Sequence, residues 1–253
     1  MFLPPGPFHS FNREERNAVA ALFGLLMQAD NLERFAGLLD WSPDDLVDSE
    51  VAVEWTFRRD LWNHHALLGD QDALRADILD TLQPSNRVEL EAASTLAFNE
   101  FFAASPRPSK LSIQFPGRWS LRRFDETIID NDEFVRTCRY KWAHNIKPDL
   151  VAMTPSGKVL CIEAKMFSPE GPYPSGPTDV AVFARRGLQS LSQTSVQRYL
   201  VEELLGLDGT FAFLALTHVD TAAGRSVTWS EVFGALEWSS TPGWVQDWIR
   251  RII

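Results

Sequence analysis

The stretch that decides the fold is residues 146–167, IKPDLVAMTPSGKVLCIEAKMF. It holds two apolar runs, 146–153 and 158–167, on either side of the sequence Thr-Pro-Ser-Gly at 154–157. Apolar runs of this length that flank a Pro and Gly cluster are typical of two strands joined by a turn. The stretch therefore predicts a β-hairpin.

Charged side chains lie inside this apolar hairpin. Side chains alternate between the faces of a strand, so Glu163 and Lys165 share one face of the second strand. Asp149, on the preceding strand, can lie across from them. A solvated Glu–Lys pair is the simplest alternative, and it contributes little to stability. Charged residues are nevertheless rare in so apolar a strand unless they are paired or have a role in binding or catalysis. Their presence here therefore favours a functional cluster.

Two carboxylates beside a lysine have a definite chemical use. Carboxylate oxygens are the ligands that Mg²⁺ prefers, and it takes only one or two of them from a protein. The ion polarises a phosphoryl oxygen and lowers the pKa of a bound water. A neighbouring ammonium group can stabilise negative charge that develops on a phosphate. The cluster is thus suited to hydrolysis of a phosphodiester.

The sequence Pro148-Asp149, followed on the next strand by Glu163-Ala164-Lys165, resembles the PD-(D/E)xK nuclease superfamily. The resemblance covers roughly residues 87–217, about half the chain. It implies an α/β restriction-endonuclease-like core of helix, three strands, helix and strand. It also implies that Asp149, Glu163 and the carbonyl oxygen of Ala164 bind Mg²⁺ or Mn²⁺, and that Lys165 is the catalytic lysine.

The resemblance suggests two further site residues. Many members carry a glutamine on the helix after the hairpin, and Gln193 is the candidate, in a stripe with Gln189 and Gln197. The family often has another acidic residue on the helix before the first strand. Glu100 is the preferred candidate for a metal ligand there, ahead of the other acidic residues considered, which are Glu89, Glu91, Glu14 and Glu15. An ordinary solvated helix face explains the glutamines equally well, and it explains each of the acidic residues, taken singly, better than a metal site does.

Outward from the hairpin, the chain divides at about residue 86. Residues 1–86 read as an acidic, all-helical N-terminal extension, and 87–253 as the nuclease-like core with helices at its C-terminal end. Within the core, 111–115 and 210–216 are further predicted strands, and 180–205 is predicted to be one long helix. Helices are also expected at 229–237 and 243–252.

Charge is distributed unevenly along the sequence. Residues 1–104 hold 18 Asp and Glu against 7 Lys and Arg, so we expect this region to avoid the phosphates of a nucleic acid. Residues 105–147 hold 9 Lys and Arg against 5 Asp and Glu. Trp119, Tyr140 and Trp142 are interleaved with these basic residues. They either stack on unpaired bases or belong to the core, with the arginines paired to nearby acids.

Composition excludes several classes of protein. Two cysteines cannot form a disulfide framework or a cysteine-based zinc site. The longest apolar run, 18–27, is half of what a membrane helix needs, and no signal-peptide pattern is visible, so we expect a cytoplasmic protein that does not bind membranes.

The expected function is a Mg²⁺-dependent nuclease, with DNA as its substrate. The alternative is a catalytically inactive nuclease fold that binds nucleic acid or a protein partner. In either case the acidic helical region offers a surface for a protein partner or a second copy of the chain. If Lys165 is catalytic, Lys165→Ala should slow turnover while leaving the stability nearly unchanged.

Overall fold

The computed structural model describes residues 15–28, 30–42, 46, 48–102, 107–166, 169–221 and 224–252. The chain forms two compact units. The first comprises residues 1–55, 147–170 and 201–253, and the second comprises 56–146 and 171–200. No described helix has the length and apolar character that crossing a membrane requires.

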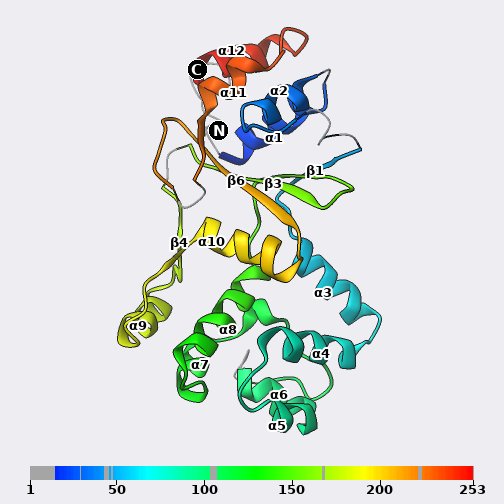
Figure 1. Ribbon diagram of the computed structural model, residues 1–253, viewed down its shortest axis with the longest axis vertical. Helices are drawn as coiled ribbons and strands as arrows, with labels where there is room; N and C mark the ends of the chain where they lie inside the picture. Colours follow the sequence, from blue (N-terminus) through cyan, green and yellow to red (C-terminus); the bar gives the residue numbers. More distant parts are fainter. Residues whose placement is uncertain are drawn as a thin grey trace, which may run out of the picture. The chain divides into compact units, whose positions relative to one another are not determined.

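A five-stranded mixed sheet is the centre of the first unit (Figure 1). In spatial order its strands are β1 (Glu50–Val53), β2 (Leu150–Met153), β3 (Lys158–Ala164), β6 (Asp208–Ala215) and β7 (Ser226–Thr228). The pairs β1–β2 and β2–β3 are antiparallel, whereas β3–β6 and β6–β7 are parallel. The predicted hairpin is confirmed, with Leu150 opposite Ile162. Gly157 takes a φ of 84° in its turn, a conformation that favours glycine.

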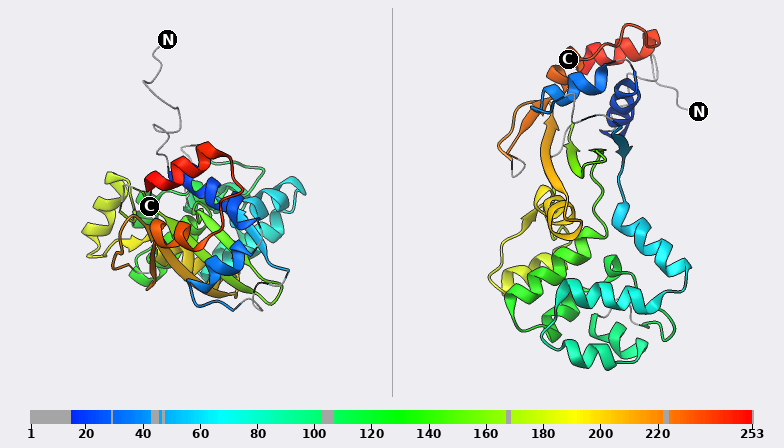
Figure 2. Two further views of the ribbon diagram at one scale, coloured as in Figure 1. Left: turned by 90° about the horizontal axis from the view of Figure 1, so that it is seen from above. Right: turned by 45° about the vertical axis from the view of Figure 1, so that its right-hand side comes forward.

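Helices cover one face of this sheet. They are α1 (Glu15–Leu26), α2 (Asn31–Gly37), α11 (Trp229–Ala235) and α12 (Gly243–Ile252). Figures 1 and 2 show these four helices gathered on the same side. The alternation of β3 explains the arrangement, because Leu160, Ile162 and Ala164 join the core beneath the helices. Val159 and Cys161 point to the other face, where they pack in a second apolar cluster.

The second unit is mostly helical (cyan to yellow in Figure 2). Its helices are α3 (Phe57–Leu67), α4 (Gln71–Leu82), α5 (Arg87–Ala92), α6 (Thr95–Phe102), the short 3-10 turn η3 (Pro116–Arg118), α7 (Leu121–Thr127), α8 (Asn131–Ala143), α9 (Pro177–Arg185) and α10 (Gln193–Arg198). Two-residue strands β4 (Pro172–Tyr173) and β5 (Leu191–Ser192) pair with each other. A π-helical segment, η4 (Tyr199–Leu204), leads the chain back into the first unit.

The predicted α/β class is confirmed, but the predicted division at residue 86 is wrong. The N-terminal region is not an all-helical extension, because β1 pairs with β2 at the edge of the sheet and α1 packs on that sheet. Residues 56–146 instead form part of the second unit, inserted between β1 and β2. The sequence analysis did not predict β1, because this strand is only four residues long and is partly exposed.

Two element predictions also fail. Residues 111–115 form no strand; Asn99 holds this segment through hydrogen bonds from its side chain to the carbonyls of Ser109 and Ser112, both 2.9 Å long. The predicted helix 180–205 is broken after Arg185, where Gly187 takes a φ of 68°. A new helix begins only after Ser192, whose side chain accepts the N–H of Ser195. In both segments, local hydrogen bonds or the backbone conformation of a glycine prevail over the pattern of apolar residues from which the element was predicted.

Candidate carboxylate and lysine site

The predicted cluster forms at one end of the hairpin. Asp149 immediately precedes β2, Glu163 lies within β3, and Lys165 immediately follows β3. The side chain of Asp149 reaches across the hairpin, where its Oδ2 accepts the backbone N–H of Ala164 at 2.8 Å. The antiparallel register of β2 and β3 thus brings Asp149 beside Glu163 and Lys165.

Lys165 is the centre of this cluster. Its Nζ donates to Oε1 of Glu163 and to Oε1 of Glu15, the latter at 3.1 Å, and lies 3.9 Å from Oδ2 of Asp149. Three carboxylates therefore lie around one ammonium group. The Glu163 side chain is 1% exposed, and those of Asp149 and Lys165 are each 12% exposed. The carbonyl of Lys165 accepts the indole N–H of the buried Trp229 at 3.1 Å, which fixes the end of β3.

Glu15 supplies the third carboxylate, from the first turn of α1. Its second oxygen, Oε2, accepts the backbone N–H of Met166 at 3.2 Å. The sequence places Glu15 only among the remoter candidates for an acidic residue on a helix. The sequence shows only that the apolar face of β3 requires a covering helix, and the structure shows that α1 is that helix. Glu14 lies outside the described residues.

The other predicted site residues belong to the second unit. Glu100 is exposed on α6, and Gln193 begins α10, where its backbone N–H donates to the carbonyl of Gly171. Their roles stay predictions. The predicted glutamine stripe is wrong, because Gln189 precedes α10 and is not on the same helix as Gln193 and Gln197. Glu89 and Glu91 are exposed on α5.

The electrostatics of the cluster follow from its burial. Burial raises the pKa of Asp149 to about 6, although the N–H of Ala164 and the ammonium of Lys165 oppose that shift. Burial alone would lower the pKa of Lys165. The surrounding carboxylates, Glu163 above all, outweigh this effect and raise it to about 12. Lys165 is therefore protonated at neutral pH.

The donor set suits a hard divalent cation. Three carboxylates and one ammonium leave negative charge that a divalent ion can balance, and all of the donors are oxygens. As the side chains stand, no group of three or more His, Cys, Asp or Glu within the described ranges is arranged to hold a metal. Lys165 is the cation on which the carboxylates converge, so metal binding requires its ammonium to move away from them.

This pairing corrects one expectation. The sequence predicts that Lys165→Ala leaves stability nearly unchanged, but the ammonium neutralises Glu163, which is almost fully buried. Removing one partner of a buried ion pair leaves an uncompensated charge in a poorly solvated place. The lysine is thus structural as well as a candidate catalytic residue.

A cleft of about 680 Å³ opens beside Lys165. Its wall includes the apolar side chains of Met166, Phe213 and Leu216, and the acidic residues Glu170 and Asp220. Of the described residues that line it, Lys165 is the one with a positive charge. The cleft therefore presents a single cation next to the carboxylate cluster.

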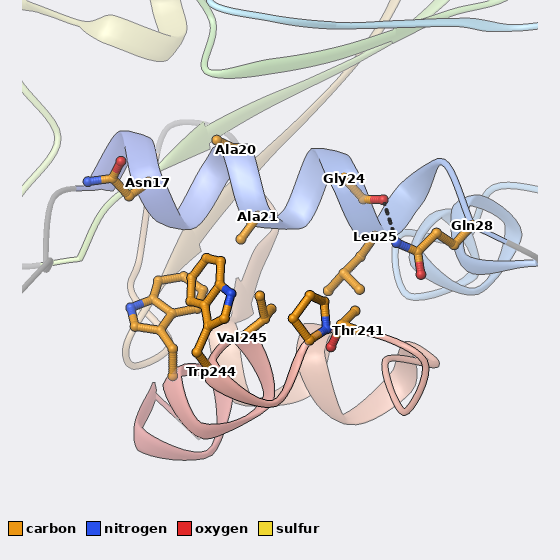
Figure 3. A pocket seen from close by; sticks show the side chains of 11 residues that line it. Asn17, Ala20, Ala21, Gly24, Leu25, Gln28, Thr241, Trp244 and Val245 are labelled. Carbon is orange, nitrogen blue, oxygen red and sulfur yellow. Dashed lines mark hydrogen bonds between the residues drawn. The ribbon is translucent and has the colours of Figure 1, made fainter. Parts of the chain in front are cut away.

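A second groove, of about 400 Å³, lies between α1 and α12 (Figure 3). Figure 3 shows the small residues Ala20, Ala21 and Gly24 of α1 across from Trp244 and Val245. The described residues that line this groove include none with a titratable side chain. Acid–base or metal chemistry in the first unit is thus favoured at the Lys165 cleft.

The charge of the two units differs. The ranges of the first unit hold 20 Asp and Glu against 9 Lys and Arg, and those of the second hold 14 against 15. Glu15 of the acidic N-terminal region is part of the candidate site, and the expectation that this region avoids the phosphates of a nucleic acid stays a prediction. The site therefore belongs to the acidic unit of the protein.

The three aromatic residues that are interleaved with the basic residues give no stacking surface. Trp119, Tyr140 and Trp142 are each at most 3% exposed, so they are core residues. Arg122 and Arg123 lie close to Glu126, and Arg136 donates to the carbonyl of Leu82. The structure thus favours the alternative in which these aromatics are core. The other basic residues of this segment are Arg107, Lys110, Arg118, Arg139, Lys141 and Lys147. Of these, Lys147 pairs with Glu54 in the first unit.

Comparison of the chain with protein families, with curated proteins and with solved structures finds no match.

The raised pKa of Asp149 predicts a dependence of stability on pH. Its pKa is about 6 in the folded protein, against an ordinary value of 3.8 for an aspartate, so the folded state binds the proton more tightly than the unfolded chain. The stabilisation from protonated Asp149 is present below about pH 4 and is lost as the pH rises through 6. Relative to Asp149→Asn, the wild-type free energy of unfolding should fall by about 3 kcal/mol over this range, since a tenfold change in proton affinity corresponds to about 1.4 kcal/mol. Denaturant unfolding of both proteins in a chelator at pH 4, 5, 6 and 7 measures the difference between their free energies of unfolding. A difference that does not change with pH would contradict the prediction.

Proposed function

We propose that the protein is a metal-dependent phosphodiesterase of the PD-(D/E)xK type that acts on nucleic acid, with DNA as the expected substrate. The observation that carries this proposal is the convergence of Asp149, Glu163 and Lys165 at one end of the hairpin. The order of elements supports it. Leaving aside the second unit, α1, β1, β2, β3, η4 and β6 follow the helix, three strands, helix and strand of the resemblance.

In this proposal Asp149 and Glu163 hold Mg²⁺ or Mn²⁺, together with the carbonyl oxygen of Ala164. The ion supplies polarisation of the phosphoryl oxygen and a bound water of lowered pKa. The N–H of Ala164 orients Asp149, since it donates to Oδ2. Lys165 offers its charge to the phosphate from the cleft that it lines. Glu15 is not one of these metal ligands, so its contact with Nζ, 3.1 Å long in the structure, can hold the lysine nearby once the ammonium has left Asp149 and Glu163.

A second candidate is a nuclease fold without catalysis. It is favoured by the position of Lys165, whose ammonium already compensates the carboxylates, and by the acidic balance of the first unit. In that case Lys165 would serve stability alone, and the protein would bind a partner rather than cleave a substrate. The two candidates differ in whether the carboxylates take up a metal.

The decisive experiment combines cleavage with metal binding. Plasmid DNA, linear DNA, single-stranded DNA and RNA are incubated with Mg²⁺, Mn²⁺ or a chelator. We expect metal-dependent cleavage by the wild type and by Glu170→Gln, which alters a carboxylate of the same cleft. Asp149→Asn and Glu163→Gln should abolish cleavage and weaken Mn²⁺ binding measured by calorimetry. Absence of both cleavage and metal binding in the wild type would reject the proposal in favour of the non-catalytic fold.

A further inference from the structure

Three charged side chains outside the carboxylate and lysine site meet at the edge of the sheet. Nε of Arg16, in the first turn of α1, lies 3.2 Å from Oε1 of Glu54. Nζ of Lys147 lies 3.5 Å from Oε2 of the same carboxylate. All three residues belong to the first unit. Arg16 and Lys147, the basic pair, thus share one carboxylate and leave an excess of one positive charge in a unit that is otherwise acidic.

The basic pair adjoins the candidate site. Glu54 directly follows β1, and its backbone N–H donates to the carbonyl of Asp149 at 3.1 Å. Arg16 follows Glu15, which contacts Lys165. Burial is the main cause of the raised pKa of Asp149, and the negative charges of Glu15 and Glu54 add to it. A molecule that reaches the carboxylates therefore also comes within reach of the basic pair.

Glu54 is held in place by a strained backbone. It takes a φ of 51°, a conformation that residues other than glycine adopt at a cost. The N–H groups of Glu54 and Trp55 donate to the carbonyls of Asp149 and Pro148, each at 3.1 Å, and so enforce this conformation. Strain of this kind gathers at functional sites, where the surrounding structure maintains it. The fold thus fixes Glu54 beside the site.

The ion pairs of Glu54 contribute little to stability. The exposed fractions of the side chains are 74% for Arg16, 40% for Lys147 and 38% for Glu54, and pairs this exposed are weak. A cation in the first turn of a helix also opposes the helix dipole, so Arg16 is poorly placed to stabilise α1. The two cations can therefore exchange their carboxylate for another anion at little cost.

The geometry of the group indicates which anion fits. Each cation contacts a different oxygen of Glu54. A phosphodiester also presents two free oxygens and one negative charge, so it can take the place of the carboxylate between the two cations. Arginine and lysine are the side chains that most often bind the phosphates of a nucleic acid, and such contacts fix the position of the strand on the protein.

We propose that Arg16 and Lys147 bind a phosphate of the DNA backbone close to the one that is cleaved, and that Glu54 occupies this subsite in the absence of DNA. The inference rests on the proposed function for its ligand, a nucleic acid, and it adds the residues that hold the substrate in register with Lys165. Arg16 is then an exception to the expectation that residues 1–104 avoid phosphates.

Binding of DNA without cleavage tests the subsite on the full chain. The probe is a short fluorescein-labelled duplex, its anisotropy is measured in Ca²⁺ at several salt concentrations, and a denaturing gel confirms that it stays intact. Arg16→Gln combined with Lys147→Gln should weaken binding roughly tenfold and reduce the salt slope by about 0.9, the value of one phosphate contact. Lys158→Gln, at the other end of β3, is the control and should leave the slope unchanged.

A variant of Glu54 gives the sharpest test. Glu54→Gln removes the anion that competes with the phosphate, so it should tighten binding of the same duplex roughly fivefold. Glu50→Gln loses the same charge at the start of β1 and should change the affinity by less than about twofold. Circular dichroism checks that each variant is folded. Binding by Glu54→Gln that is no tighter than that of the wild type would overturn the proposal.

The outcomes separate this subsite from the proposed function. An unchanged salt slope in the Arg16 and Lys147 double variant, or no binding of the duplex by the wild type, would also overturn the subsite. Cleavage in Mg²⁺ alongside either result would leave the proposed function standing. The expected changes in binding without any cleavage in Mg²⁺ would support the subsite in a protein that binds DNA but does not cut it.

Discussion

Replacing Lys165 by methionine should lower the free energy of unfolding by about 3–5 kcal/mol, the usual cost of breaking a buried ion pair from one side. The side chain of Glu163 is 1% exposed, and its carboxylate contacts the positively charged Nζ of Lys165. Methionine carries no charge, so the carboxylate of Glu163 would be left without its partner. Asp149 and Glu15 would lose the same positive charge. Denaturant unfolding in a chelator, at neutral pH, measures the effect.

Two further variants separate charge from packing in this first prediction. Lys165→Met combined with Glu163→Gln removes both charges of the pair and should recover most of the lost stability, because no buried carboxylate of that pair remains. Lys158→Met, at the other end of β3, is the matched control and should change stability by less than about 1 kcal/mol. Equal destabilisation by the single and double variants would mean that the loss arises from packing.

Lys165→Gln should slow cleavage by about 10²–10³-fold, the effect of losing one preorganised group that meets charge in a transition state. Glutamine retains a hydrogen-bond donor beside Glu163 but carries no positive charge, so the substitution tests the electrostatic role. This prediction rests on the proposed function. It is measured as initial rates with saturating Mg²⁺, at a temperature where circular dichroism shows the variant to be folded.

Metal affinity provides the control for this second prediction. Lys165→Gln removes a positive charge from within 3.9 Å of three carboxylates, so it should not weaken Mn²⁺ binding. A slow variant that still binds metal assigns the lysine to catalysis. Cleavage that stays near the wild-type rate would refute the electrostatic role and would leave Lys165 as a structural residue.

The candidate site could be predicted only in part from the sequence. Asp149 and Lys165 stand fourteen residues before and two residues after Glu163 on one hairpin, so local strand geometry suffices to bring them together. Glu15 stands 150 residues from Lys165, and no local rule relates the two. Only the packing of α1 on the apolar face of β3 decides that contact.

The sequence by itself determined the hairpin, its two faces and the α/β class, because alternation and turn residues act over a few positions. It also specified the two C-terminal helices, α11 and α12, closely. The tertiary structure alone decided that the N-terminal region belongs to the sheet unit and that residues 56–146 are inserted between β1 and β2. The pairing of β1 with β2 joins residues about 100 positions apart, and such pairing depends on which sheet edge is open, a property that no local pattern encodes.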